Sequence, residues 1–292
     1  MKPHQLHAFL AVAEQGSIRA AARQLFVSQP AVTRTVRELE ASLDVPLITR
    51  SAHGIELTEY GKAFRVRARL LVEESRRARE ELQQIKQGMT GLVRIGVSSL
   101  PAMVLLPEAF ARFRTVMPQA DLHCIDGQLP IGVPLLRSGE LDFLVSQAMP
   151  DSIEKDMTSE VLFTTPLTAA ARSTHPKIRA RTLAALVNEE WTGWNRAMIS
   201  SLFAQHGLAA PQRILTSHSF EVTQALIEKT DLISLFSLPL VERKLVKHGI
   251  RPIRLREALP LLSVSIIMRR DARLTPAGAQ FLQILRELAA QL

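Results

Sequence analysis

A short segment near the N-terminus, FVSQPAVTRTVRELE (residues 26–40), carries side chains suited to reading nucleic-acid bases. Glutamine can bind adenine through two hydrogen bonds, and arginine can bind guanine or hold a phosphate. The alternative is an amphipathic helix whose polar face meets only solvent. The polar side chains on the outward face of this segment are Gln29, Thr33, Arg34 and Arg37.

The surrounding sequence predicts a helix-turn-helix that holds this face. Gly16 ends a first helix, Ser17 caps a second, and Ser28 caps a third with Pro30 in its first turn. The tight connection between the last two makes residues 28–42 the recognition helix. Apolar residues at helical spacing form the three core faces: Leu6, Phe9, Leu10 and Ala13; Ile18, Ala21, Ala22 and Leu25; Val32, Val36, Leu39 and Leu43.

Residues 46–57 predict a small two-stranded wing after the recognition helix. A strand over 46–48 is followed by a turn over 51–54 and a return strand. Arg50 and His53 lie at the tip, where cations add phosphate attraction that does not depend on base sequence.

One long polar helix is predicted over residues 58–88, with Thr58 as its cap. Apolar and small residues recur in a 3–4 alternation that is typical of helix pairing, so we expect a homodimer through this helix. The alternative is a helix that lies on its own domain. The pairing seam consists of Phe64, Ala68, Leu71, Ser75, Ala78, Leu82 and Ile85. The expected exposed charges are Arg65, Arg67, Arg69, Glu73, Glu74, Arg76, Arg77, Arg79, Glu80 and Glu81.

From residue 92 onward, strands alternate with helices, which predicts two α/β lobes with parallel sheets and a ligand cleft between them. The segment 87–91 is the expected linker, and 107–117 the first crossover helix. The expected strands are 92–97, 120–126, 141–146, 165–171, 231–236 and 263–268.

The composition is that of a globular protein with a basic surface. Hydrophobic residues make up 47% and charged residues 22% of the 292 residues, and the formal net charge is +8. This length allows two or three domains. A basic balance favours an anionic partner, with nucleic acid first among the candidates.

Cysteine usage and the N-terminal segment indicate a reducing, cytoplasmic location. The one cysteine, Cys124, excludes an intrachain disulfide, and its apolar surroundings predict a buried strand residue. The N-terminal apolar run FLAVA is too short for an export signal. No run approaches the ~18 apolar residues of a membrane helix, so we expect no membrane partner.

The order of motifs in residues 3–65 resembles the LysR-type transcriptional regulators. The resemblance is carried by GSIRAAARQLFVSQPAVTRTVRELEASLDVPLITR and GIELTEYG, and beyond residue 92 by layout and the short segments GELDF and LTPAGAQFL. It implies an α+β multi-domain fold: a winged helix-turn-helix over 1–57, a linker and dimerisation helix with a hinge over 58–90, and a periplasmic-binding-protein-like domain. In that domain, lobe one would span 91–164 plus 266–292, and lobe two 165–265.

The resemblance also implies the DNA contacts. Gln29 would approach base edges, Pro30 would make apolar contact, and Arg34 would reach bases or backbone. Ser28 and Thr33 would contact phosphates, wing Arg50 would hold the minor-groove side, and Thr58 would lie near phosphate. Arg37 and His53 complete the expected DNA-binding residues. His53 stands where the family commonly has arginine, which implies weaker and pH-sensitive wing contact. Ile48 stands where phenylalanine is usual, which changes packing only.

An effector in the cleft would meet loops at the carboxyl ends of the strands. We expect no cofactor, but a small-molecule co-inducer that is anionic or aromatic; the nearest members sense aromatic sulfonates or aromatic carboxylate conjugates. The expected contacts are Ser98, Ser99, Leu100, Gln128, Leu129, Ser146, Gln147, Trp194, Asn195, Ser219, Phe220 and Phe236. Effector binding would alter the shape of a homotetramer and the bend of double-stranded DNA.

Three other classes of function explain less of the chain. An enzyme would need a catalytic motif, and only the isolated Ser-x-x-Lys match at 152–155 is present. A transport binding protein would explain the lobes but not the first 90 residues. A DNA-compacting protein would leave the two-lobed domain without a role.

Overall fold

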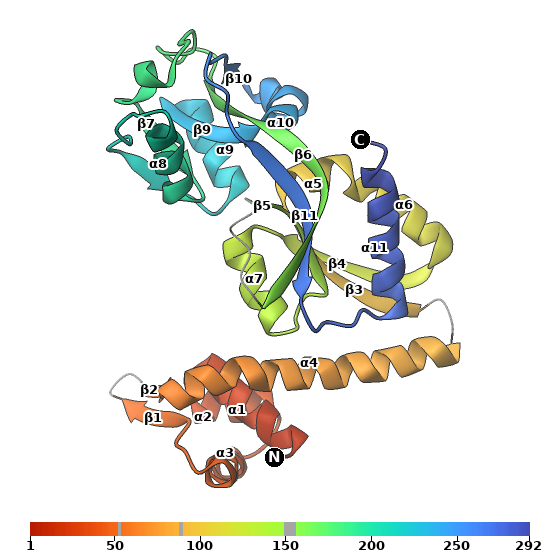
Figure 1. Ribbon diagram of the computed structural model, residues 1–292. Helices are drawn as coiled ribbons and strands as arrows, with labels where there is room; N and C mark the ends of the chain where they lie inside the picture. The colour runs from red at the N-terminus through yellow and green to blue at the C-terminus, as the bar shows by residue number, and fades with distance from the viewer. Residues whose placement is uncertain (52–53, 88–89, 149–155) are drawn as a thin grey trace.

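The computed structural model describes residues 1–51, 54–87, 90–148 and 156–292, and it confirms the expected fold class. A small helical domain lies below one long helix, and a two-lobed α/β domain lies above it (Figure 1). The N-terminal elements are α1 (Pro3–Gln15), α2 (Ile18–Gln24), α3 (Gln29–Leu43), β1 (Ile48–Ser51) and β2 (Gly54–Leu57).

The second and third N-terminal helices begin at the predicted caps. The Ser17 hydroxyl accepts from the backbone N–H of Ala20 at 3.3 Å, and that of Ser28 accepts from Ala31 at 3.4 Å. The apolar faces of α1, α2 and α3 bury one another. The helix-turn-helix therefore forms as the apolar spacing predicts.

The wing begins later than predicted. Glu40 Oε1 accepts from the backbone N–H of Leu47 at 2.7 Å and of Ile48 at 3.1 Å. These two N–H groups are therefore bound by a side chain of α3 and not by a neighbouring strand. β1 pairs with β2 in antiparallel register from Ile48–Leu57 to Ser51–Gly54. The Ile55 N–H donates to Gly16 O at 2.9 Å, which docks the wing on the turn before α2.

The long helix α4 (Glu59–Gln87) starts at its predicted cap, because the Gly61 N–H donates to Thr58 Oγ1 at 3.0 Å. Its N-terminal half packs on α1 through Phe64, Ala68 and Val72. The rings of Phe9 and Phe64 lie 5.3 Å apart. The start of α4 is thus part of the helix-turn-helix core.

The α/β domain has one mixed sheet with the strand order β4-β3-β5-β11-β6-β9-β7-β8, and β10 pairs with β6. We call the part around β3, β4 and β5 lobe one, and the part around β7, β8 and β9 lobe two. The strands of lobe one are β3 (Thr90–Val97), β4 (Gln119–Asp126) and β5 (Phe143–Ala148); its helices are α5 (Ser99–Val104), α6 (Leu106–Val116), α7 (Leu129–Arg137) and α11 (Pro276–Ala289).

Lobe two packs around Trp191 and Phe203, whose rings lie edge to face at 5.4 Å. Its strands are β7 (Glu190–Gly193), β8 (Ile214–Thr216), β9 (Leu232–Ser237) and β10 (Ile250–Ile253). Its helices are α8 (Arg196–Gln205), α9 (Phe220–Lys229) and α10 (Leu238–Arg243), with the 3-10 turns η2 (Leu183–Leu186) and η3 (Leu245–His248).

Two long antiparallel strands, β6 (Met157–Arg172) and β11 (Leu261–Arg269), join the lobes. β6 pairs with β11 up to Pro166, and then with β9 and β10. The expected wholly parallel sheets are therefore wrong. The segment 165–171 is the second half of β6, because one strand serves both lobes.

Two expectations about burial are also wrong. Cys124 lies in β4 but is exposed, because β4 ends the strand order and its residues are only partly covered. Arg77 of α4 was expected among exposed charges, but it is buried. Among the described residues, no helix is long and apolar enough to cross a membrane.

Arg77 fixes the C-terminal half of α4 on lobe one. Its guanidinium donates to the carbonyls of Gly139 and Leu141 at 2.8 and 2.9 Å, and pairs with Asp142 Oδ1 at 3.0 Å. Burial raises the pKa of the Asp142 carboxyl, and the charge of Arg77 opposes this shift. A buried ion pair of this kind fixes the positions of its two residues more than it raises the free energy of unfolding.

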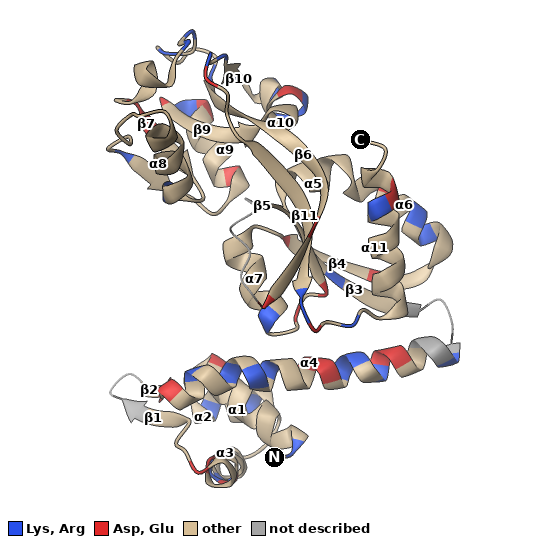
Figure 2. Cartoon of the chain, in the orientation of Figure 1, with Lys and Arg blue, Asp and Glu red and all other residues tan. Residues whose placement is uncertain are grey.

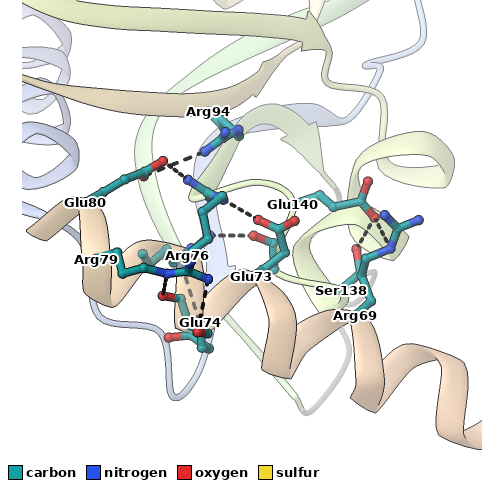
Figure 3. Close-up of polar contacts among 12 residues, drawn as sticks. Arg69, Glu73, Glu74, Arg76, Arg79, Glu80, Arg94, Ser138 and Glu140 are labelled. Carbon is teal, nitrogen blue, oxygen red and sulfur yellow. Dashed lines mark hydrogen bonds and ion pairs between the residues drawn. The ribbon is translucent and has the colours of Figure 1, made fainter. Parts of the chain in front are cut away.

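Further ion pairs surround this contact (Figure 3). Arg269 Nη2 of β11 lies 2.8 Å from Glu74 Oε1, while Arg69 pairs with both Glu14 of α1 and Glu140 of lobe one. Charges alternate along α4 on this side (Figure 2). Because Arg69 contacts both domains, the network ties lobe one to the helix-turn-helix. We call Arg69, Arg77 and Arg269 with their partners the α4 latch.

The substitution Arg77→Met should destabilise the protein by about 3–5 kcal/mol, because it leaves Asp142 buried without its counter-charge. Urea unfolding monitored by circular dichroism measures this loss. The matched control is Arg79→Met, on the exposed side of the same helix, and it should change stability little. Equal losses in both variants would contradict the role given to Arg77.

Candidate DNA interface and effector cavity

The exposed side of α3 forms a shallow hollow. Its buried side consists of Val32, Val36 and Leu39, which pack in the N-terminal domain. The polar face therefore points outward, as the spacing predicts. The hollow is lined by Gln29, Pro30, Thr33, Arg34, Arg37, Glu38 and Ala41.

Two of these side chains are bound within the helix. Arg34 Nε donates to Glu38 Oε1 at 2.8 Å, and this hydrogen bond holds the pKa of the Glu38 carboxyl below its usual value. Thr33 donates to the carbonyl of Gln29 at 3.0 Å. The Arg34 side chain remains 83% exposed, so a phosphate or base edge could displace Glu38.

The remaining predicted DNA contacts come from the start of α3, from the wing and from the start of α4. Ser28 caps α3, and the Thr58 hydroxyl donates to Pro46 O at 2.6 Å while it caps α4. The backbone of Arg50 pairs with Ile55 in the wing. His53 lies outside the described residues. The DNA-contact roles of all these residues stay predictions.

A large aromatic side chain beside the hollow was not predicted. Phe26, in the turn between α2 and α3, is 95% exposed and has a positive φ of 56°. At the end of α2, the Phe26 N–H donates to the Arg23 carbonyl and the Val27 N–H donates to the Ala22 carbonyl. The sequence did indicate this exposed position, because Phe26 belongs to none of the three predicted core faces.

A cavity lies between the lobes, at the carboxyl ends of their strands. It has an empty volume of about 730 Å³, including the part open to solvent. Ten of the twelve expected effector contacts line it: Ser98, Ser99, Gln128, Leu129, Ser146, Gln147, Trp194, Ser219, Phe220 and Phe236. Their role in binding an effector stays a prediction.

The other two expected contacts do not line this cavity. Leu100 is 1% exposed and packs in the core of lobe one. Asn195 caps α8, where its Oδ1 accepts from the N–H groups of Ala197 and Met198 at 2.9 and 3.3 Å. Leu100 therefore serves the core of lobe one, and Asn195 serves the start of α8.

Ten lining residues were not predicted. They are Leu167, Gly193, Met198, Ser217, Thr223, Ser234, Leu235, Ser237, Leu240 and Leu262. Leu167 and Leu262 come from the strands that join the lobes, and the others come from lobe two. Only the long-range pairing of β6, β9 and β11 brings them together, and that register has no local signal.

Hydrogen bonds between neighbouring elements shape the cavity wall. The Gln147 N–H donates to Ser98 Oγ at 3.3 Å, which joins the ends of β3 and β5. Ser219 caps α9 by accepting from the Val222 N–H at 3.2 Å. No group of three or more potential metal ligands occurs within the described ranges.

Two family models match the chain. The model "Bacterial regulatory helix-turn-helix protein, lysR family" matches residues 3–62. The model "LysR substrate binding domain" matches residues 86–290. Together they cover both domains that are joined by α4.

Two known regulators are similar to this chain over most of its length. The HTH-type transcriptional regulator GalR of Pseudomonas putida is 23% identical over 98% of this chain and 74% of its own length. The regulator GbpR of Rhizobium radiobacter is 28% identical over 78% of this chain and 79% of its own.

Solved structures show the same arrangement. The crystal structure of CbnR, a LysR family transcriptional regulator, has a TM-score of 0.72 and 25% identity, with 99% of both chains covered. Full-length CbnR complexed with its target DNA has a TM-score of 0.69 and 25% identity, over 99% of this chain and 100% of that one.

Proposed function

Because this chain belongs to the LysR-type family of DNA-binding transcriptional regulators, with an effector-binding domain, we propose a specific division of labour between its parts. The recognition helix α3 enters the major groove. A small molecule in the interlobe cavity then changes how pairs of recognition helices are spaced. The protein works in the cytoplasm, where its DNA is.

The outward hollow of α3 is the observation that carries the DNA proposal. Gln29 and Arg37 are exposed there, and the opposite stripe of α3 holds the helix in the core. The major groove admits an α-helix, and the N-terminal residues of that helix reach the base edges. The solved complex of CbnR with its target DNA supports the same use of this domain.

The effector proposal rests on the position of the cavity. It lies where two lobes meet, and the strands β6 and β11 continue from one lobe to the other. A ligand that contacts both lobes can favour one angle between them. The comparisons do not support the aromatic sulfonates that the sequence suggested as effector class.

We also propose that α4 pairs with α4 of a second copy, and that two such dimers form a tetramer. Leu71 is 45% exposed and Leu82 is 67% exposed, with Ser75 and Ala78 exposed between them. This stripe faces away from lobe one, because the helix turns through about 200° from Leu71 to Glu73. One helix can therefore bind lobe one and a second α4 at once. Ile85 of the predicted seam lies outside the described side chains.

Gln29→Ala should broaden the sequence selected from a random DNA pool and weaken binding to the preferred sequence by about 1–3 kcal/mol. Arg50→Ala should weaken all sequences about equally and lower the slope of affinity against salt by about one. Gln15→Ala, an exposed glutamine of α1, is the matched control. The division of roles fails if the Gln29 and Arg50 variants lose affinity equally on random DNA.

Leu82→Glu should raise the dimer dissociation constant at least about tenfold, because it places a charge in an apolar helix seam. Sedimentation velocity at several concentrations measures this change. Val66→Glu is the control, since Val66 is 44% exposed on α4 but outside the stripe. A dimer that is equally stable in both variants would refute pairing through this face.

A further inference from the structure

The cavity wall carries polar groups but no charged side chain among the described residues. Eight lining residues bear hydroxyl groups and two bear carboxamides, and the rest are apolar or glycine. The apolar part of the wall is formed by Leu129, Leu167, Trp194, Met198, Phe220, Leu235, Phe236, Leu240 and Leu262. A ligand inside would therefore meet both carbon surface and hydrogen-bonding groups.

Three buried polar atoms on this wall have no partner in the protein: Gln128 Oε1, Gln147 Nε2 and Ser237 Oγ. Ser237 is only 1% exposed. A buried polar atom without a hydrogen bond is costly, so each of these atoms is available to a ligand. By contrast, the hydroxyls of Ser217 and Thr223 already donate to the carbonyl of Ser219.

The three free atoms require both a donor and an acceptor from the ligand. The Gln128 backbone N–H donates to Asp126 Oδ1 at 3.2 Å, and the Gln128 carboxamide lies beside the same carboxylate, which accepts only and therefore favours the N–H₂ group. Its Oε1 is then an acceptor that needs a donor. Gln147 Nε2 is a donor that needs an acceptor.

The charged side chains nearest the cavity lie in a second, outer groove and not on the cavity wall. This groove carries both signs of charge: Asp126 and Glu221, and Arg243, Lys244 and Lys247. Burial raises the pKa of the Asp126 carboxyl, and the charge of Glu221 raises it further. Lys244 Nζ, also in the outer groove, lies 4.5 Å from the centre of the Phe220 ring. An anion in the cavity would meet no cation on the wall itself, because the cations nearby belong to the outer groove.

We propose that the cavity takes an uncharged small molecule that carries hydroxyl groups as well as apolar carbon surface. A hydroxyl both donates and accepts, so it satisfies Gln128, Gln147 and Ser237, whereas a carboxylate leaves Gln128 Oε1 unpaired. A charged group would also lose its water without gaining a counter-charge. This inference rests on the proposed function, in which the cavity holds the effector.

The experiment compares neutral compounds with carboxylates of the same skeleton on the full-length protein. Suitable pairs are D-glucose with D-glucuronate and 4-hydroxybenzyl alcohol with 4-hydroxybenzoate, titrated by calorimetry up to tens of millimolar. We expect a neutral member to bind at least about tenfold more tightly than its carboxylate partner. Gln128→Leu should weaken that binding about tenfold, and the exposed control Gln212→Leu should not.

Two results would overturn the inference. One is that carboxylates bind more tightly than their neutral partners, and the other is that no neutral member binds. If carboxylates bind and Gln128→Leu weakens them, the effector cavity stands and only the ligand class fails. If a cavity ligand binds but never changes the complex with DNA, the proposed function fails instead.

Discussion

The buried guanidinium of Arg77 is the contact on which the arrangement of the domains depends. It joins α4 to the carbonyls of Gly139 and Leu141 and to Asp142, so lobe one cannot rotate freely about the linker. The other end of α4 packs on α1 through Phe64, and α1 packs on α3. A continuous chain of packed elements therefore connects the cavity lobe with the recognition helix.

Local patterns allowed the N-terminal domain to be predicted well, because each helix carries its own signal. The spacing of Val32, Val36 and Leu39 and the cap at Ser28 depend on no distant residue. The burial of Arg77 could not be predicted. Its neighbours on α4 include other arginines, and the two carbonyls and the Asp142 carboxylate that bind its guanidinium lie more than sixty residues away.

The candidate cavity was predictable on one side only. Strand ends of lobe one, such as Ser98 and Gln147, follow from the rule that ligands lie at the carboxyl ends of parallel strands. Leu262 and Ser237 depend on the pairing of β11 and β9 with β6. The sequence suggested an anionic or aromatic effector, whereas the wall supports an uncharged ligand with hydroxyl groups. The expected effector class came from the family resemblance, whereas the charge on the wall depends on which side chains of this chain meet there.

The central claim is that the α4 latch transmits the state of the cavity to DNA. The most direct measurement is the ligand-induced change in DNA bend, followed by energy transfer between dyes at the two ends of a bound duplex. The wild type should change its bend when the neutral cavity ligand is added. Arg77→Met should bind the same ligand with similar affinity and yet show little change in bend. An unaltered response in Arg77→Met, with ligand binding intact, would contradict the claim.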